Sequence, residues 1–219
     1  VKHVEVTGIP VRQAFFEAAQ TPYYLAATTP VNLVVLGGSQ GASILASLIP
    51  DAIAMLDPAM RQHLRIHQQA RPEQIDPLRH RYDDLEVTAD IQSFYTDMPS
   101  LLCQSHVVIC RAGASSVAEL AAIGRASLLL PLPSAMDDHQ RMNALQMQDA
   151  GGGICLDETN LSAAVLATRL MQLLETRKTL SNMAKSARSL ASPDAASLIA
   201  AMAENLMAAV PKKHKGTAE

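Results

Sequence analysis

Apolar residues follow two alternating patterns along the chain from residue 31 onward. Short apolar or β-branched runs, which are typical of buried strands, alternate with longer segments whose apolar residues recur at helical spacing. The predicted strands lie near residues 32–36, 63–67, 85–88, 106–110, 126–130 and 153–156. The predicted helices lie near residues 42–56, 73–81, 98–104, 115–123, 138–149, 161–175, 178–191 and 194–208. Strands that alternate with helices form βαβ units, so the pattern predicts an α/β fold, a Rossmann-like parallel sheet with helices on both faces.

The first thirty residues depart from this alternation. Residues 4–7 alternate like a strand, residues 8–12 indicate a turn because Gly and Pro punctuate them, and residues 13–30 are irregular. The chain opens on Val1 without a methionine, which indicates a fragment of a longer protein. At the other end, we expect the last two predicted helices to wrap the sheet.

Polar or glycine-rich loops follow three of the predicted strands. These loops are residues 37–41 (Gly-Gly-Ser-Gln-Gly), 111–116 and 133–140, and each of them opens a predicted helix. In open parallel sheets, ligands bind beyond the carboxyl ends of the strands. Glycines let the backbone approach a ligand, and helix N-termini favour an anion. The sequence therefore predicts one mouth, lined by three helix N-termini, for a ligand such as a diphosphate.

The loops do not match the two common nucleotide motifs. A dinucleotide fingerprint needs G-x-G-x-x-G with an acidic residue about 20 positions later, and Asp51 comes too early to serve. A Walker loop needs a lysine in the turn, and the first loop has none. The site is therefore predicted to be of another kind.

Several polar side chains at this mouth have two interpretations each. Ser39 would donate a hydrogen bond to a phosphate or cap the following helix, and local sequence does not decide between them. Glu119 would bind a ribose diol or, more commonly for such a motif, complete a capping box with Ser116. Gln140 and Asn143 suit sugar hydroxyls, since amides both donate and accept, but a solvated helix N-terminus would look the same.

The amino-acid composition argues against several kinds of partner and site. A net charge of -3 and 3% aromatic residues provide neither an electrostatic footprint nor a stacking platform for nucleic acid. Cys103, Cys110 and Cys155 stand singly, which favours structural thiols in a reducing cytoplasm over disulfides or metal ligands. No apolar run is long enough to span a bilayer, and residues 211–215 form a short basic tail.

Five motifs, in order, carry a family resemblance: VTGIPVR (6–12), LGGSQGA (36–42), SFYTDMP (93–99), CRAGASSVAEL (110–120) and DDHQRMNA (137–144). They resemble the C-terminal half of the MurG family, bacterial glycosyltransferases that add N-acetylglucosamine to lipid I in peptidoglycan synthesis. Residues 183–188 and 193–196 extend the resemblance through the last helices. The resemblance implies a GT-B enzyme, in which two Rossmann-like domains face each other across a cleft.

The resemblance also implies roles for individual residues. Arg12 and Ser39 would bind the diphosphate of UDP-N-acetylglucosamine, the donor. The backbone at Tyr95 would pair with uracil, Glu119 would hold the ribose, and Gln140 would hold the sugar. The complete donor-binding set is Arg12, Gly38, Ser39, Gln40, Tyr95, Ala114, Ser115, Ser116, Val117, Ala118, Glu119, Gln140 and Asn143.

Four segments follow from this assignment. We expect an interdomain or entry segment (1–30), a nucleotide-sugar-binding domain (31–192), a C-terminal wrapping helix (193–209) and a basic disordered tail (210–219). Arg125 stands where the family commonly has proline, away from the mouth, and we expect it to alter only a turn.

The family's acceptor domain, which would bind lipid I, would precede Val1. The full-length protein would carry out an inverting displacement that releases UDP, at the inner face of the bacterial plasma membrane. No cofactor and no metal is expected, because helix dipoles and Arg12 can stabilise the leaving diphosphate. We therefore expect this chain alone to bind the donor weakly and to have no transferase activity.

Two other functions are compatible with the same sequence. The chain would be a noncatalytic donor-binding subunit that needs a separate acceptor-domain chain, or an enzyme related to UDP-N-acetylglucosamine 2-epimerases. A genuine translation start at Val1 would favour the first, and isomerised sugar as the product would favour the second.

Overall fold

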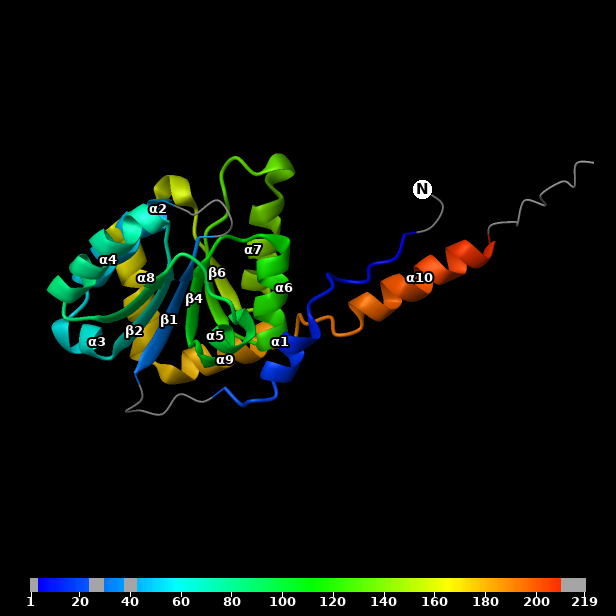
Figure 1. Ribbon diagram of the computed structural model, residues 1–219, viewed down its shortest axis with the longest axis horizontal. Coiled ribbons are helices and arrows are strands. Elements are labelled where there is room, and N and C mark those ends of the chain that lie inside the picture. The colour runs from blue at the N-terminus through cyan, green and yellow to red at the C-terminus, as the bar shows by residue number, and fades with distance from the viewer. Residues whose placement is uncertain (1–3, 24–29, 38–42, 210–219) are drawn as a thin grey trace, which may run out of the picture.

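The chain folds around one parallel β-sheet (Figure 1), as seen in a computed structural model that describes residues 4–23, 30–37 and 43–209. Six strands pair side by side in the order β3-β2-β1-β4-β5-β6, and each pair is parallel. The strands are β1 (Val31–Leu36), β2 (Leu64–Gln69), β3 (Thr88–Gln92), β4 (Val107–Cys110), β5 (Ala126–Leu129) and β6 (Gly153–Cys155). This order confirms the predicted α/β class with a Rossmann-like sheet.

Helices connect the strands and cover both faces of the sheet (Figure 1). The described α-helices are α1 (Gln13–Ala18), α2 (Ser43–Ala54), α3 (Pro58–Gln62), α4 (Pro72–Asp84), α5 (Met98–Gln104), α6 (Ala114–Ile123), α7 (His139–Asp149), α8 (Ala163–Glu175), α9 (Arg177–Arg188) and α10 (Ala195–Ala209). Two short 3-10 helices, η1 (Met136–Asp138) and η2 (Glu158–Asn160), lie in loops after β5 and β6.

The core has two layers because successive strand side chains point to opposite faces. On β1, Leu33 and Val35 pack into one layer, together with α2, α4 and α8. Val34, between them, packs into the other layer, which is built mainly from α1, α5, α6 and α7. Strands covered on both faces are mostly apolar, which explains the apolar runs at residues 33–36 of β1 and 107–110 of β4.

Three local predictions differ from the structure. Residues 4–7 form no strand, since they are largely exposed and do not join the described sheet. The third strand begins at Thr88 rather than near residue 85, because α4 runs on to Asp84 and Glu86 then takes a positive φ of 56°. Helices α1 and α3 form in segments where no helix was predicted; α3 begins with Pro58 in its first turn and is capped by the Asp57 side chain.

The last two helices behave differently from each other. Helix α9 packs against the end of the sheet where β5 and β6 begin. It buries Leu180, Met183 and Ala187, as expected for a wrapping helix. Helix α10 instead leads away from the sheet (Figure 1), and Leu206 and Met207 are 69% and 76% exposed. The expectation that both helices wrap the sheet therefore holds only for α9.

The described helices include none that combines the length and the apolarity needed to cross a membrane. The basic segment near residue 212 lies outside the described residues.

Candidate functional site

The ends of three neighbouring strands lie level with one another. Leu36 at the end of β1 pairs with Cys110 at the end of β4, which in turn pairs with Leu129 at the end of β5. The chain leaves β1 toward β2 and leaves β4 toward β5, so the sheet order reverses between β1 and β4. Such a reversal opens a crevice in doubly wound sheets. The ends of β1, β4 and β5, which the three predicted loops follow, therefore lie side by side at one end of the sheet, at the top of Figure 1.

Helix α6 begins at this edge without a side-chain cap. Its N-cap is Gly113, in an extended conformation, so Ser116 lies inside the first helical turn rather than at the cap. The capping box predicted for Ser116 and Glu119 is therefore wrong, because that motif requires the helix to begin after Ser116. The first N–H groups of α6 are left to other acceptors, as at anion-binding helix ends.

Glu119 lies on α6, one turn further in, and is half-buried. Burial raises the pKa of its carboxyl group, and the positive charge of Arg12 partly opposes that rise. The Arg12 guanidinium carbon lies 5.0 Å from the centre of the Phe15 ring at the start of α1. The turn of residues 9–12 is thus brought within electrostatic range of α6, although the two segments lie far apart in the sequence.

Helix α7 supplies two amides that tie the mouth together. The Gln140 Oε1 atom accepts a hydrogen bond of 3.0 Å from the backbone N–H of Leu132, in the loop after β5. The Asn143 Nδ2 group donates a hydrogen bond of 3.0 Å to the carbonyl oxygen of Ala112, in the turn after β4. Both side chains therefore hold neighbouring loops in place, and both are half-buried at the edge of the sheet.

The turn that opens α7 has an unusual backbone. Asp137 and Asp138 have φ angles of 51° and 54°, in the left-handed region that residues other than Gly seldom adopt. Such conformations cost about 1–3 kcal/mol each and are found most often at binding and catalytic sites. The strain coincides with the third predicted loop of the mouth.

The remaining residues of the predicted donor-binding set lie in the loop after β3, in helix α6 and in the turn after β1. The Tyr95 side chain is buried, and its hydroxyl donates a hydrogen bond of 2.8 Å to the carbonyl oxygen of Asp90. This side chain therefore anchors the loop after β3, and only its backbone is left for a ligand. Ala114, Ser115, Val117 and Ala118 complete the first turns of α6. Gly38, Ser39 and Gln40 lie outside the described residues.

One ion pair at the mouth was not predicted from the sequence. The guanidinium of Arg111, directly after β4, donates to the Glu158 carboxylate of η2 and, at 3.3 Å, to the carbonyl oxygen of Leu130. The pair is mostly buried and joins the ends of β4 and β5 to the loop after β6. The two residues are 47 positions apart, so only the tertiary fold brings them together.

The surroundings of the mouth add two further observations. A cavity of about 120 Å³ lies against α6, between the turn of residues 8–11 and Asn143. Burial raises the pKa of the Cys110 thiol to about 12, and the nearby Glu119 charge adds to this rise.

Within the described part of the chain, no three His, Cys, Asp or Glu side chains gather in a metal-ligand arrangement.

Comparison with known proteins identifies the family. The sequence model of the glycosyltransferase family 28 C-terminal domain matches residues 32–199. The chain belongs to this family. The match includes the glycine-rich turn, the start of α6 and the strained turn before α7, the three loops that make up the predicted mouth.

Curated relatives agree with this family 28 assignment. A protein of Sinorhizobium fredii is 43% identical over 198 residues, which are 90% of this chain and 53% of the relative. A protein of Paramagnetospirillum magneticum is 43% identical over 202 residues, which are 92% of this chain and 54% of the relative. Both are named UDP-N-acetylglucosamine--N-acetylmuramyl-(pentapeptide) pyrophosphoryl-undecaprenol N-acetylglucosamine transferase. The chain spans about half the length of the curated relatives it matches.

Solved structures support the same family assignment. MurG of Acinetobacter baumannii superposes with a TM-score of 0.75 at 30% identity, over 87% of this chain and 53% of MurG. The chain is thus a MurG homologue with the fold of a GT-B C-terminal domain. A putative UDP-N-acetylglucosamine 2-epimerase from Listeria monocytogenes also superposes, with a TM-score of 0.59, but at 13% identity this likeness concerns the fold alone.

Proposed function

We propose that the chain is the donor-binding half of an inverting N-acetylglucosaminyltransferase, with UDP-N-acetylglucosamine as the donor. The observation that carries this proposal is the start of α6, where uncapped N–H groups lie one turn from the half-buried Glu119 carboxylate. The first group of donors suits a diphosphate, and the carboxylate suits a ribose diol. The names of the curated relatives support the same donor.

The other residues of the mouth take complementary roles in this proposal. Arg12 neutralises diphosphate charge beside α6, together with the glycine-rich turn that contains Gly38, Ser39 and Gln40. The backbone at Tyr95 pairs with the uracil. The amides of Gln140 and Asn143 contact the sugar, and their hydrogen bonds to the two loops fix their orientation. A held amide loses less conformational entropy on binding than a free one.

The proposed reaction is a direct displacement at the anomeric carbon of the donor sugar. An acceptor hydroxyl attacks that carbon, the bond to the diphosphate breaks, and UDP leaves with the electron pair. This chain stabilises the leaving diphosphate through the α6 N-terminus and Arg12. The acceptor, lipid I, and the base that removes its proton are assigned to an acceptor domain outside this chain.

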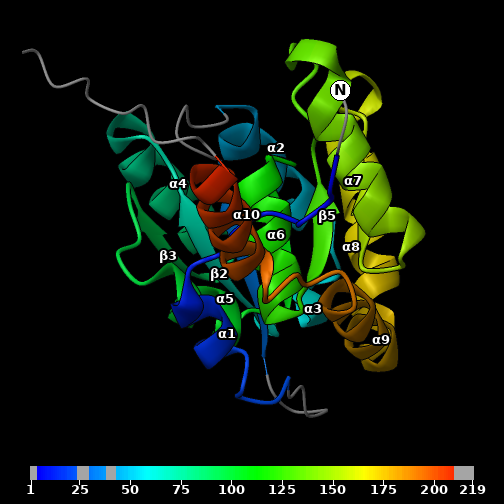
Figure 2. The same ribbon diagram turned by 90° about the vertical axis from the view of Figure 1, so that its right-hand side faces the viewer.

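Two observations support the assignment of donor binding to this chain and acceptor binding to another domain. The chain spans about half the length of its curated relatives, and it exposes apolar side chains. Val4, Val6, Leu206 and Met207 are 75%, 93%, 69% and 76% exposed, on segments that project from the side of the sheet seen in Figure 2. Such surfaces are typical of faces that another domain covers. The proposed enzyme works at the cytoplasmic face of the membrane, where its lipid acceptor lies.

Calorimetric titration of the chain with UDP-N-acetylglucosamine, UDP-glucose and UDP tests the proposal. Glu119→Ala is expected to weaken all three affinities about tenfold to a hundredfold, since a hydrogen bond to a charged group contributes about 1.5–3 kcal/mol. Gln140→Ala is expected to reduce the preference for UDP-N-acetylglucosamine over UDP. Glu204→Ala and Gln172→Ala, at exposed helix positions, serve as matched controls.

Two outcomes would contradict the proposal. Equal affinities of Glu119→Ala and Glu204→Ala would remove the ribose role, and unchanged sugar discrimination in Gln140→Ala would remove the sugar role. We also expect no transfer to a lipid I analogue by the 219-residue chain. Turnover by the isolated chain would show that the acceptor domain is not required.

A further inference from the structure

The ion pair between Arg111 and Glu158 spans the end of β5 at the mouth. The backbone N–H of Leu130 donates a hydrogen bond of 2.9 Å to the carbonyl oxygen at the end of β4. The backbone N–H of Leu156 donates one of 2.8 Å to the carbonyl oxygen at the end of β5. These bonds hold the chain beyond β4, β5 and β6 side by side. Arg111 follows β4 directly and Glu158 comes shortly after Leu156, so their side chains meet across the end of β5.

Both members of this pair are largely withdrawn from water, with 14% and 20% of their side chains exposed. The Arg111 guanidinium also donates a hydrogen bond of 3.3 Å to the carbonyl oxygen of Leu130. The Asp157 side chain accepts hydrogen bonds of 3.0 and 2.8 Å from the backbone N–H and the hydroxyl of Thr159, which fixes the turn that carries Glu158. A pair so far from water interacts more strongly than an exposed one, because solvent screens it less.

The pair holds the link between β4 and α6 from one side. This link consists of residues 111–113. From the other side, the Asn143 amide holds it through the carbonyl oxygen of Ala112. The carbonyl oxygen of Gly113 then accepts the first hydrogen bond of α6, of 3.0 Å, from the N–H of Val117. A short link held on both sides leaves the helix start little freedom, so the pair helps to set where the uncapped N–H groups of α6 point.

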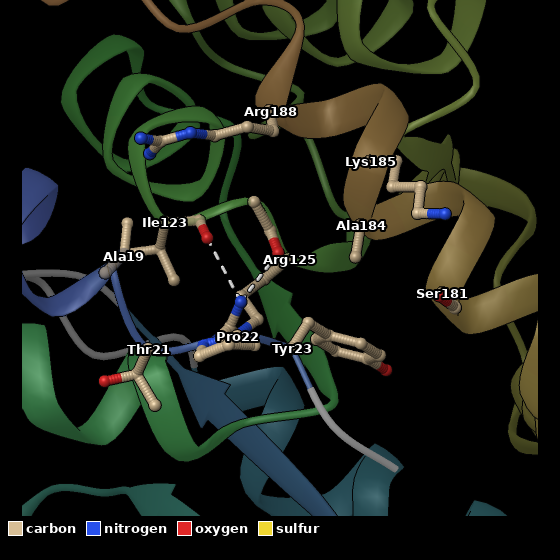
Figure 3. A pocket seen from close by; sticks show the side chains of 11 residues that line it. Ala19, Thr21, Pro22, Tyr23, Ile123, Arg125, Ser181, Ala184, Lys185 and Arg188 are labelled. Atoms are coloured by element: carbon tan, nitrogen blue, oxygen red, sulfur yellow. Dashed lines mark hydrogen bonds between the residues drawn. The ribbon is translucent and has the colours of Figure 1, made fainter.

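Arg125, at the opposite end of the sheet, shows a different way to bury an arginine. It is 2% exposed, and its guanidinium donates to carbonyl oxygens at the ends of α5 and α6; Figure 3 shows its bonding to the end of α6. Main-chain oxygens thus suffice for a structural guanidinium. Glu158 instead places a full negative charge beside a mouth proposed to bind a diphosphate, and like charges repel. Its hold on Arg111 explains this carboxylate better than any attraction of the ligand.

We propose that Arg111 and Glu158 are positioning residues for donor binding. Their ion pair orients residues 111–113 and so aims the uncapped N–H groups of α6 at the diphosphate. Donors that are already aimed at a charged group need no reorganisation when it arrives. This inference rests on the proposed function, which assigns the start of α6 to the diphosphate, and it adds two residues outside the predicted donor-binding set.

The affinities of Glu158→Ala for UDP and uridine, measured by calorimetry and by NMR titration, test this role. The substitution removes a negative charge, so charge alone would strengthen UDP binding. Loss of positioning acts in the opposite direction: we expect UDP to bind about tenfold more weakly, as when one charge-assisted hydrogen bond is poorly made. The uridine affinity should stay unchanged, because uridine carries no phosphate. A merely structural defect would weaken both ligands alike and would overturn the proposal.

Glu158→Gln is the conservative variant for this test. It removes the same charge, but its amide oxygen still accepts a hydrogen bond from Arg111. We therefore expect Glu158→Gln to restore most of the UDP affinity that Glu158→Ala loses. Glu175→Ala, which removes an exposed carboxylate at the end of α8, is the matched control and should leave both affinities unchanged. Equal UDP affinities of Glu158→Ala and Glu158→Gln, or no loss in Glu158→Ala relative to the control, would overturn the proposal.

The double variant Arg111→Gln/Glu158→Ala shows whether Arg111 contacts the diphosphate itself. The pair is absent from both the double variant and Glu158→Ala, so a positioning role predicts similar UDP affinities for the two. Sodium chloride at about 0.5 M screens the long-range attraction of the Arg111 charge in this comparison. A further loss of about tenfold in the double variant would make Arg111 a direct ligand, contrary to the proposal.

The unmodified chain and Glu119→Ala, measured beside these variants, separate this inference from the function on which it rests. If UDP does not bind to the unmodified chain, both fail. If UDP binds and the affinity depends on Glu119 but not on Glu158, the donor site stands and only the positioning role fails.

Discussion

At the scale of single residues, Glu119 and Arg125 show how tertiary surroundings change what a charged side chain can do. Glu119 had a common local explanation, a capping box, which the true start of α6 removes. Arg125 was expected to alter only a turn, but it is buried and binds four main-chain carbonyl oxygens. Neither outcome could be obtained from the neighbouring residues in the sequence.

The raised pKa of Glu119 predicts a pH dependence of donor binding. The ionised carboxylate accepts hydrogen bonds from the ribose, whereas a protonated one has lost acceptor capacity. Because the pKa is raised, the affinity should begin to fall at a higher pH than the ordinary Glu value of about 4.3 would give. Calorimetry with UDP-N-acetylglucosamine from pH ~7.5 downward, at about half-unit steps, measures this effect. Glu119→Gln should bind more weakly near neutrality and lack this component of the profile; an identical slope in both proteins would rule the carboxylate out.

Arg125→Met tests the buried guanidinium. The substitution leaves the carbonyl oxygens at the ends of α5 and α6 without their donor, and an unsatisfied buried acceptor costs about 1–3 kcal/mol. We expect the free energy of unfolding in urea to fall by about 3 kcal/mol or more. Lys178→Met, at an exposed position, should change it by no more than about 0.5 kcal/mol. A loss of under about 1 kcal/mol in Arg125→Met would mean that water replaces the guanidinium without cost.

At the scale of elements, close packing of α9 against the end of the sheet depends on a glycine. A Cβ atom at Gly152, just before β6, would lie 2.7 Å from the backbone N and Cα atoms of Ala187 in α9. Backbone atoms of a packed helix cannot move aside as the end of a flexible side chain can. The residue therefore sets the distance between α9 and β6.

Gly152→Ala is expected to lower the free energy of unfolding by about 1–3 kcal/mol, the usual cost of overpacking a well-filled site. Urea denaturation measures the change, and hydrogen exchange of the α9 amides reports whether the helix separates from the sheet. Gly151→Ala is a comparison, because that Cβ would meet only the Ser186 side chain, at 3.4 Å, while a φ of 79° adds strain. If only Gly151→Ala speeds hydrogen exchange in α9, the close contact at Gly152 does not hold this helix against the sheet.

At the scale of the whole molecule, the sheet and its helices form the stable unit, and α10 projects from it (Figure 1). Ala195 at the start of α10 is buried, whereas Leu198, Ile199 and Leu206 are 42%, 41% and 69% exposed. Apolar residues that remain exposed contribute little to the stability of this chain. They fit the proposal that another domain covers this helix in the complete enzyme.

Truncation after residue 197 tests this division. Removing residues 198–219 should change the free energy of unfolding by no more than about 1 kcal/mol, because the deleted side chains of the described helix are largely exposed. Truncation after residue 176 also removes α9, with the buried Leu180 and Met183, and should prevent folding. A large loss of stability in the shorter deletion, seen in urea or thermal denaturation, would show that α10 belongs to the core.

Local sequence patterns predicted the α/β class, most of the strands, and polar or glycine-rich segments after β1, β4 and β5. These features depend on local periodicity and on glycine-rich turns, which neighbouring residues encode. The boundaries of β3 and the helices α1 and α3 were missed, since short elements are fixed by what they pack against. The five motifs were enough to indicate the family, because five motifs in one order form a specific signature, and the family model matches residues 32–199.

Which side chains meet at the mouth became known only from the folded chain. It placed Leu36, Cys110 and Leu129 level at one edge, joined Arg111 to Glu158, and brought Arg12 into range of Glu119. It also placed the Arg125 guanidinium among the carbonyl oxygens at the ends of α5 and α6, away from the five motifs. The physical reason is that burial and Coulomb interactions depend on distance in space, whereas a sequence pattern records only distance along the chain.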